Sequence, residues 1–259
     1  MKKFPLINVF LVVVLILSIS CKKDDDNDDN GSTPPIVNEY LIDFTDGTAE
    51  GWLPVDGTWM VENNVYKVTS NQTYFANTCY FDSILSNYEL SVKVRKTAGE
   101  PCNVGVSFNG DPTSVGPLGN WNNTYKLIVC THNGWSIGKI VDTVFTEFEV
   151  GNSPDIIKGL SQWNLLTVRV FNGQIDVLFN GILQGTYQDN TFPSGRVGIT
   201  MFDQNYNGVA EFDFVRIKEI TSSDNMATMK DHGIRKVYEK GKYQGDCTDC
   251  SKPEPVKTI

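Results

Sequence analysis

The chain has little histidine, no excess of positive charge and no hydrophobic run long enough for a transmembrane helix. Only His132 and His232 are histidines among 259 residues, which excludes a metal centre built from several imidazoles. The formal net charge is −9 at pH 7, so no nucleic-acid partner is expected, because phosphate backbones bind basic surfaces. The longest apolar run, residues 4–19, is shorter than the roughly 20 residues that cross a bilayer. With 40% hydrophobic residues, the chain can still bury one domain-sized core.

The N-terminus has the layout of a secretory signal. Lys2 and Lys3 precede the apolar run, and small residues lead to Cys21. Residues 17–21, Leu-Ser-Ile-Ser-Cys, resemble the lipobox of bacterial lipoproteins, in which the chain is cut before the cysteine and the cysteine is acylated. An ordinary signal peptide with an incidental cysteine is the alternative. We predict a signal peptide at 1–20 and a lipidated Cys21.

A Lys-then-acidic block, Lys-Lys-Asp-Asp-Asp-Asn-Asp-Asp-Asn, follows at residues 22–30. An acidic run has no core to bury and stays solvated, so 21–38 is predicted to be a flexible tether. Directly after the cysteine, the block resembles the export signal of lipoproteins displayed on the outer face of some Gram-negative bacteria. A plain solvated spacer is the alternative. We therefore expect an outer-membrane protein that faces the cell exterior and contacts the membrane only through its lipid.

Residues 39–220 alternate apolar and polar side chains and contain no convincing amphipathic helix. Alternation with a period of two is typical of half-buried strands. The clearest examples are 89–95, 103–108 and 125–129. Turn signals of the Asn-Gly type separate such segments, which predicts an all-β, two-sheet antiparallel sandwich.

The strongest local signal is a hairpin around the Asn-Gly pair at 172–173. This pair favours a two-residue type I′ turn, because both central residues of that turn need φ > 0. The resulting register gathers the apolar residues of both strands on one face and sets Arg169 opposite Asp176 on the other. A slip by one residue destroys both matches, so the register is well specified.

Several motifs in sequence resemble a known fold family. They are Gly-Trp at 51–52, Gly-Thr-Trp at 57–59, Trp-Asn-Leu-Leu-Thr-Val at 163–168, Phe-Asn-Gly at 179–181, Ser-Gly-Arg-Val-Gly-Ile at 194–199 and the closing strand at 212–217. In this order they resemble the concanavalin A-like jelly rolls, in particular the laminin-G-like and 3-keto-disaccharide-hydrolase-like domains of bacterial lipoproteins. The resemblance covers 39–220 and implies a jelly-roll sandwich in which Trp52, Trp59 and Trp163 pack the core. Trp121 and Trp135 have no such core assignment.

The catalytic motifs that belong to this resemblance are absent. Laminarinase-type members of the fold carry an E-x-D-x-x-E strand, whose first two carboxylates share one face of the strand. The nearest patterns are Glu-Phe-Glu at 147–149 and Glu-Phe-Asp at 211–213, and we interpret both as solvated outer faces opposite a buried phenylalanine. The Ser-Gly turn expected after 88–95 is missing, no G-x-S-x-G elbow occurs, and His132 is interpreted as a turn residue. We expect no catalytic residue.

The cysteines give little evidence of a disulfide framework. After acylation of Cys21 an odd number remains, so at least one thiol is unpaired. If Phe108 faces Tyr125, Cys102 and Cys130 point to opposite sides of the sheet, and we expect no bond between them. The remaining cysteines are Cys79, Cys102, Cys130, Cys247 and Cys250. The last two form a C-x-x-C in a mostly irregular tail, 221–259, where they are predicted to be a local disulfide or free thiols.

A ligand site is predicted on two loops. Trp121 lies in a connection rich in asparagine, and an indole is a flat apolar surface on which a sugar ring can stack. The alternative is that Trp121 packs into the edge of the sandwich and anchors its loop. The hypothesis requires an exposed Trp121 and both loops on the same side of the sandwich. The predicted ligand contacts are Trp121, Asn120, Asn122 and Asp111 from the loop 109–123, and Asp203 and Tyr206 from the loop 202–208.

The sequence therefore predicts a surface-exposed lipoprotein with a non-catalytic carbohydrate-binding sandwich. An acidic domain suits neutral glycans as partners. No cofactor and no metal site are predicted, although Asp111 and Asp203 leave room for a structural calcium ion. Two alternatives stay open. One is a hydrolase that acts on a sugar derivative, and the other is a structural module that contacts another envelope protein.

Overall fold

The computed structural model describes residues 38–101 and 103–221. The predictions for the signal peptide, Cys21, the tether, Cys102 and the C-terminal tail lie outside these residues. The described part consists of strands, turns and irregular segments, and it contains no helix that could cross a membrane. The predicted all-β class is confirmed.

Fifteen strands make up the domain. In chain order they are β1 (Glu39–Ile42), β2 (Trp52–Pro54), β3 (Thr58–Glu62), β4 (Val65–Thr69), β5 (Ala76–Leu85), β6 (Tyr88–Ala98), β7 (Val104–Gly110), β8 (Thr124–Val129), β9 (Gly134–Val141), β10 (Val144–Asn152), β11 (Asn164–Phe171), β12 (Gln174–Phe179), β13 (Ile182–Gln188), β14 (Gly195–Phe202) and β15 (Val209–Glu219).

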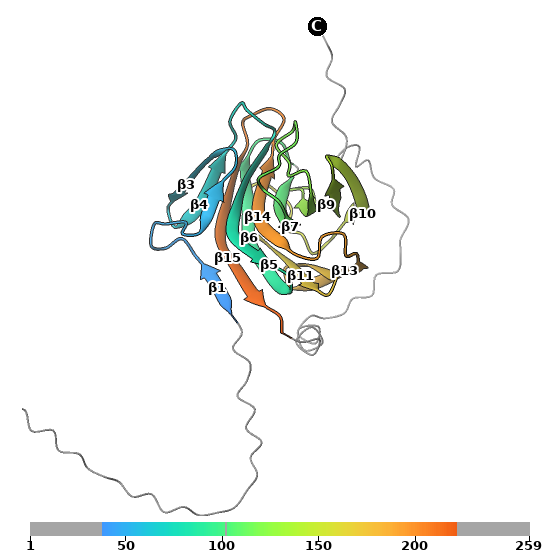
Figure 1. Cartoon of the computed structure of the whole chain (residues 1–259). Coiled ribbons are helices and arrows are strands. Elements are labelled where there is room, and N and C mark those ends of the chain that lie inside the picture. The colour runs from blue at the N-terminus through green and yellow to red at the C-terminus, as the bar shows by residue number, and fades with distance from the viewer. Residues whose placement is uncertain (1–37, 102, 222–259) are drawn as a thin grey trace, which may run out of the picture. The chain divides into compact units, whose positions relative to one another are not determined.

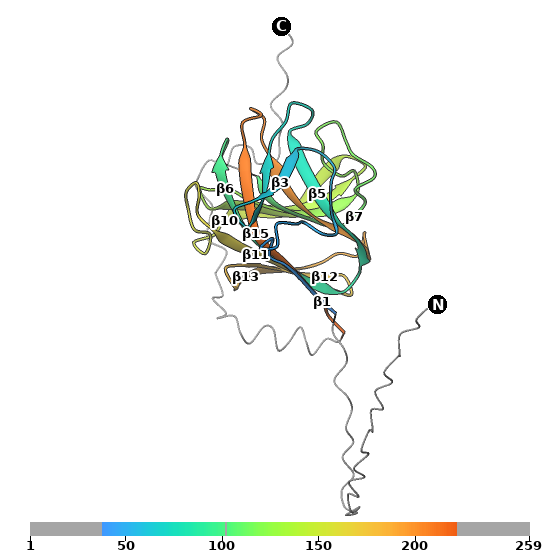
Figure 2. The same ribbon diagram turned by 90° about the vertical axis from the view of Figure 1, so that its left-hand side faces the viewer.

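These strands form two antiparallel sheets (Figure 1). The eight-stranded sheet has the order β13-β12-β11-β6-β15-β4-β3, with β1 paired to β15. The seven-stranded sheet has the order β10-β9-β8-β7-β14-β5-β2. In Figure 2, β1 and the end of β15 lie side by side where the described chain begins and ends. The predicted two-sheet sandwich is confirmed.

Alternate residues of both sheets point inward and form a single core. In the seven-stranded sheet, Val106 and Phe108 of β7 lie opposite Leu127 and Tyr125 of β8, and all four are buried in the core. In this register Phe108 faces Tyr125, as the alternation in the sequence predicts. Because neighbouring residues of a strand point to opposite faces, the residues between these four form the outer face of the sheet.

The β11–β12 hairpin has the predicted register. Arg169 pairs with Asp176, and Asn172 and Gly173 have φ values of 49° and 79°, as a type I′ turn requires. On the other side of β11, the Arg169 guanidinium donates from Nε to Glu89 Oε2 of β6 at 2.7 Å. A row of alternating charges therefore crosses three strands on the outer face of the eight-stranded sheet.

Candidate functional site

Trp121 is buried against the outer face of the seven-stranded sheet, so its predicted exposure as a stacking platform is wrong. The residue is 1% exposed, and its indole N–H donates to Thr78 Oγ1 at 3.3 Å. Gly198 and Gly110 contact the indole so closely that a Cβ atom on either would lie 2.6 Å from it. The ring also packs edge-on against Tyr80, with 6.3 Å between centroids. Trp121 therefore anchors its loop by packing.

The rest of that loop, residues 111–123, is shaped by its own hydrogen bonds. The Asp111 carboxylate is exposed but accepts the hydroxyl and the backbone N–H of Thr113 at 2.7 and 2.9 Å, and these bonds lower its pKa. Asn122 donates from Nδ2 to Ser114 Oγ at 2.8 Å, and its backbone N–H donates to Ser114 O at 2.9 Å. Two of the predicted contact residues, Asp111 and Asn122, thus hold the conformation of the loop.

Asp203, from the second loop, is fully buried and paired. Its Oδ2 lies 3.5 Å from Nζ of Lys96, which is also buried, and accepts the Glu100 N–H at 3.1 Å. Its Oδ1 accepts the Asn205 N–H at 3.0 Å. The carboxylate therefore neutralises a buried lysine, and the predicted ligand contact through Asp203 stays an untested prediction at a buried residue.

Both loops lie at the same end of the sandwich, as the hypothesis required. The segment before β5 touches each of them. The Ala76 N–H donates to Leu118 O of the first loop at 2.9 Å, and the Asp203 N–H of the second loop donates to Phe75 O at 2.9 Å. Tyr206 is half-buried against the Phe75 ring, with 5.2 Å between centroids.

The environments of Trp163 and Trp135 are the reverse of those predicted. Trp163 was predicted in the core but is half-buried outside it, with the Arg95 guanidinium 4.4 Å and the Lys93 ammonium 5.4 Å from its ring centroid. Trp135 had no core assignment but is 4% exposed and packs edge-on against Phe179 inside the core. Register explains the difference, because Trp135 occupies an inward position of β9 whereas Trp163 precedes β11.

Glu211 and Asp213 of β15 are engaged in ion pairs. Glu211 accepts Arg95 Nε at 2.7 Å, and Asp213 accepts Lys93 Nζ at 2.8 Å. Phe212 between them is buried in the core, as predicted. This alternation matches an outer face whose charges are balanced across neighbouring strands, and it provides no free carboxylate pair.

No cluster of three or more His, Cys, Asp or Glu side chains suited to a metal ion occurs within 38–101 and 103–221. Asp111 and Asp203, which the sequence offered for calcium, are engaged by Thr113 and Lys96 as described above. The Cys79 thiol lies 3.4 Å from the Tyr66 hydroxyl, and burial raises its pKa to about 12, so it stays protonated.

The outer face of the seven-stranded sheet carries small residues where a solvated strand would carry charged ones. Strand register aligns its residues in two rows. One row contains Gly138, Lys126, Ser107 and Gly198, and the other contains Ser136, Ile128, Gly105 and Thr200. We call these eight residues the floor. Sequence reasoning missed the floor, although small residues at alternate positions of 104–110, 134–141 and 195–202 are a signal that could have found it.

Two hydroxyl groups of the floor are buried without a hydrogen-bond partner among the described residues. Ser136 is 0% exposed and Thr200 is 1% exposed, and neither Ser136 Oγ nor Thr200 Oγ1 is paired. Leaving a buried hydroxyl unpaired costs about 1–3 kcal/mol. Groups of this kind are uncommon in folded proteins, so each needs an explanation. A ligand with its own hydroxyl groups would supply both missing partners.

The first loop borders the floor. Lys126, the one charged floor residue, is 6% exposed and donates from Nζ to Asn120 Oδ1. Trp121 covers Gly198, which stands two positions from Lys126 in the same row, beyond Ser107. Asn120 and Trp121 are therefore the predicted contact residues that the structure brings to the floor, and Tyr206 contacts Phe75 instead.

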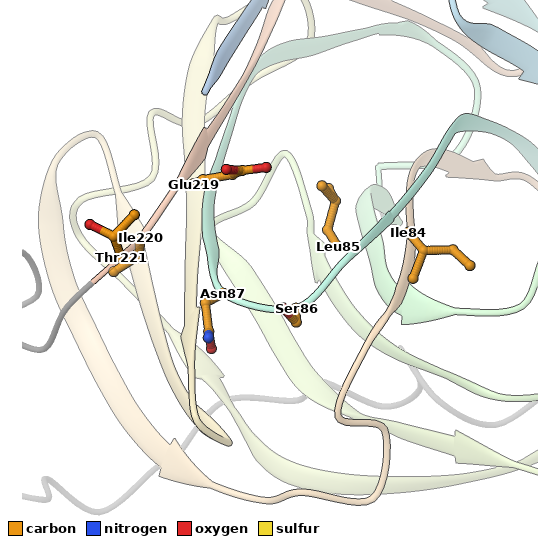
Figure 3. Close-up of a pocket in the computed structure, with 7 residues that line it drawn as sticks. All are labelled: Ile84, Leu85, Ser86, Asn87, Glu219, Ile220 and Thr221. Atoms are coloured by element: carbon orange, nitrogen blue, oxygen red, sulfur yellow. The ribbon is translucent and has the colours of Figure 1, made fainter. Parts of the chain in front are cut away.

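A shallow pocket of about 240 Å³ lies elsewhere, at the β5–β6 turn beside the end of β15 (Figure 3). It is lined by Ile84, Leu85, Ser86, Asn87, Glu219, Ile220 and Thr221. Its polar groups are largely engaged. Asn87 accepts the Asn172 N–H through Oδ1 at 2.9 Å and the Ile220 N–H through its carbonyl at 3.0 Å. The pocket therefore offers a ligand less polar complementarity than the floor does.

The chain is similar to known proteins in family and in fold. It matches the model of the 3-keto-alpha-glucoside-1,2-lyase-like domain family over residues 41–218, more than half of its length. The carbohydrate-binding module CBM66 from Bacillus subtilis has a TM-score of 0.53 at 16% identity, covering 64% of this chain and 94% of that one. The exoplasmic/lumenal domain of VIP36 in its Ca²⁺/Man-bound form has a TM-score of 0.54 at 11% identity, covering 68% and 85%.

The apo Crh5 transglycosylase has a TM-score of 0.53 at 12% identity, covering 71% of this chain and 85% of that one. At such identities the likeness shows the fold alone, and that fold is a concanavalin A-like sandwich. No curated protein matches the sequence.

Proposed function

The chain belongs to the 3-keto-alpha-glucoside-1,2-lyase-like domain family, and from that membership we propose that its sandwich binds a carbohydrate on the floor of the seven-stranded sheet. The observation that carries the proposal is the pair of buried, unpaired hydroxyl groups, Ser136 Oγ and Thr200 Oγ1. A sugar presents hydroxyl groups on its edges and C–H groups on its faces. It can therefore supply the missing partners of both hydroxyls and pack its apolar face against Ile128, once these buried groups are uncovered for binding.

The spacing of the two hydroxyl groups favours an oligosaccharide of at least two rings. Ser136 and Thr200 stand in the same row, separated by Ile128 and Gly105. Three strand spacings correspond to about 14 Å between their Cα atoms. A single ring can reach one of these hydroxyls, whereas two linked rings can reach both.

The chemistry of the floor supports binding rather than glycoside hydrolysis. Hydrolysis of a glycosidic bond requires two carboxylates on either side of it. The four strands that form the floor, β7, β8, β9 and β14, contain no Asp or Glu. The second candidate, an enzyme that acts on a sugar derivative, is favoured by the description of the family, and its acid or base would come from outside these strands.

The sequence supports a place for this binding at the cell surface. A signal peptide at 1–20, lipidation of Cys21 and the acidic tether at 21–38 would anchor the sandwich to the outer membrane with the domain facing the exterior. In that setting the sandwich would capture glycans at the cell surface. Contact with another envelope protein is the further role that this placement allows.

Removal of the unpaired hydroxyls tests the proposal. Thr200→Val and Ser136→Ala keep the size of the side chain nearly unchanged, and each removes a hydroxyl that has no hydrogen-bond partner within 38–101 and 103–221. We expect both variants to melt at the same temperature as the unchanged protein or higher, because a buried unpaired polar group is removed. On a glycan array, we expect retention of the best-bound glycan to fall about tenfold for each variant.

Thr58→Val, on the exposed face of β3 in the other sheet, is the matched control and should leave retention unchanged. A turnover assay on the bound glycans runs in parallel. Full retention by both floor variants would contradict the proposed site, and cleavage of a bound sugar would favour the enzyme.

A further inference from the structure

Lys126 is buried on the floor without a counter-ion among the described residues. Its ammonium group donates to the neutral Asn120 Oδ1, and none of the ion pairs found in the described part of the chain involves it. Burial lowers its pKa to about 8, so the amine still carries its proton at pH 7. The floor therefore holds a positively charged group on the same face of the sheet as its two unpaired hydroxyls.

The other buried lysine shows how the same fold treats such a charge elsewhere. Lys96 is 2% exposed, and its Nζ lies 3.5 Å from the buried carboxylate of Asp203. An amide oxygen, by contrast, brings no negative charge and accepts one of the three ammonium hydrogens. A buried charge without an opposite charge is strongly unfavourable. Lys126 thus has both an unbalanced charge and N–H groups left for a ligand.

We propose that the carbohydrate bound on the floor is an acidic sugar whose carboxylate pairs with Lys126 Nζ. This inference rests on the proposed carbohydrate-binding function and adds the chemical class of the ligand. The carboxylate supplies the missing negative charge and accepts the remaining ammonium hydrogens. The hydroxyls of the same ligand meet Ser136 and Thr200, which register places on the neighbouring row.

The distances suit one ligand that reaches all three groups. Lys126 lies one strand and two residues away from Ser136, which corresponds to about 8 Å between Cα atoms. It lies two strands and two residues away from Thr200, or about 12 Å. A uronate ring beside Lys126 and a second ring along the floor span this area.

The net charge of −9 does not oppose such a ligand at the site itself. Exposed charges farther away than a Debye length, about 8 Å at physiological ionic strength, are largely screened. A pair that forms inside a buried site is screened much less. The acidity of the chain therefore slows the encounter with an anionic glycan more than it weakens the bound pair.

The experiment compares each acidic oligosaccharide with its own neutral form. The purified protein is titrated calorimetrically with oligogalacturonate and oligoglucuronate, each beside its methyl ester, and with neutral glucose oligomers. We expect at least one acid to bind about tenfold or more tightly than its ester. Lys126→Met, which keeps the length of the side chain and removes its charge, should abolish this preference and raise the melting temperature.

Lys158→Met removes one positive charge from an exposed residue and is the matched control, which should keep the preference. Equal binding of acid and ester to the unchanged protein overturns the inference, as does a preference that survives Lys126→Met. If Lys126→Met does not fold, the comparison of acid and ester binding to the unchanged protein tests the inference by itself. If neutral oligomers bind and acids have no advantage, this inference fails and the proposed function stands, whereas the absence of any binding removes both.

Discussion

At the scale of a single residue, Trp121 shows how one buried side chain holds a loop against a sheet. Its indole rests on Gly110, at the end of the strand before its loop, and on Gly198 of a strand distant in the sequence, and it bonds to Thr78 of a third strand. Each glycine has to lack a side chain for the ring to approach. An asparagine-rich connection predicts exposure, whereas the burial of Trp121 depends on Thr78 and Gly198, which are distant in the sequence. The environment of Trp121 therefore could not be predicted from its neighbours in the sequence.

Truncation of Trp121 should be strongly destabilising. We expect Trp121→Ala to lower the free energy of unfolding by about 3 kcal/mol, because removing a buried aromatic ring leaves a cavity between the loop and the sheet. Urea unfolding followed by circular dichroism measures the change. Trp163→Ala is the control. That ring is half-buried against Arg95 and Lys93, so its loss should cost about 1 kcal/mol. Equal losses for the two variants would contradict the packing role of Trp121.

At the scale of elements, the β11–β12 hairpin is the best-specified part of the fold. Its turn demands positive φ at Asn172 and Gly173, and its two faces separate apolar pairs from the Arg169–Asp176 pair. Both signals are local in the sequence, so the register could be predicted. The floor could not be identified in the same way. Alternation predicts which residues point into the core, but it does not tell what the small residues on the opposite face of the sheet contact.

Substitution of the turn glycine should weaken this hairpin. Gly173 has a φ of 79°, and a Cβ atom there would lie 2.9 Å from the Gln188 side chain. We therefore expect Gly173→Ala to lower the free energy of unfolding by about 1–2 kcal/mol. Gly151→Ala is the control, because Gly151 has no positive φ and its Cβ would meet nothing closer than 3.6 Å. Thermal melts of both variants measure the difference, and a neutral Gly173→Ala would argue against the turn assignment.

At the scale of the whole molecule, the beginning and the end of the described chain lie next to each other. The Glu219 N–H donates to Asn38 O at 2.9 Å, and Asn38 Nδ2 donates to Glu219 Oε2 at 2.8 Å. The class and layout of the sandwich could be predicted from alternation and turns, because these patterns recur along the whole domain. The loop contacts could not, since Asp203 finds its partner Lys96 through the tertiary fold.

Loss of the proposed lipid attachment should release the protein from membranes. Because acylation requires the thiol, we expect Cys21→Ala expressed in a Gram-negative host to move from the membrane fraction to the soluble fraction. Ser20→Ala, which keeps the cysteine, is the control. Fractionation with immunoblotting measures the distribution. Tight membrane association of the Cys21→Ala variant would contradict lipid anchoring.

The attachment of β1 has a mechanical consequence. β1 pairs with β15 alone, through four residue pairs, whereas β15 is also held by β6 and β4. Tension applied to the chain ahead of residue 38 therefore loads β1 before it loads any other strand. Under such tension we expect β1 to separate from β15 first, while the seven-stranded sheet, which carries the floor, stays intact.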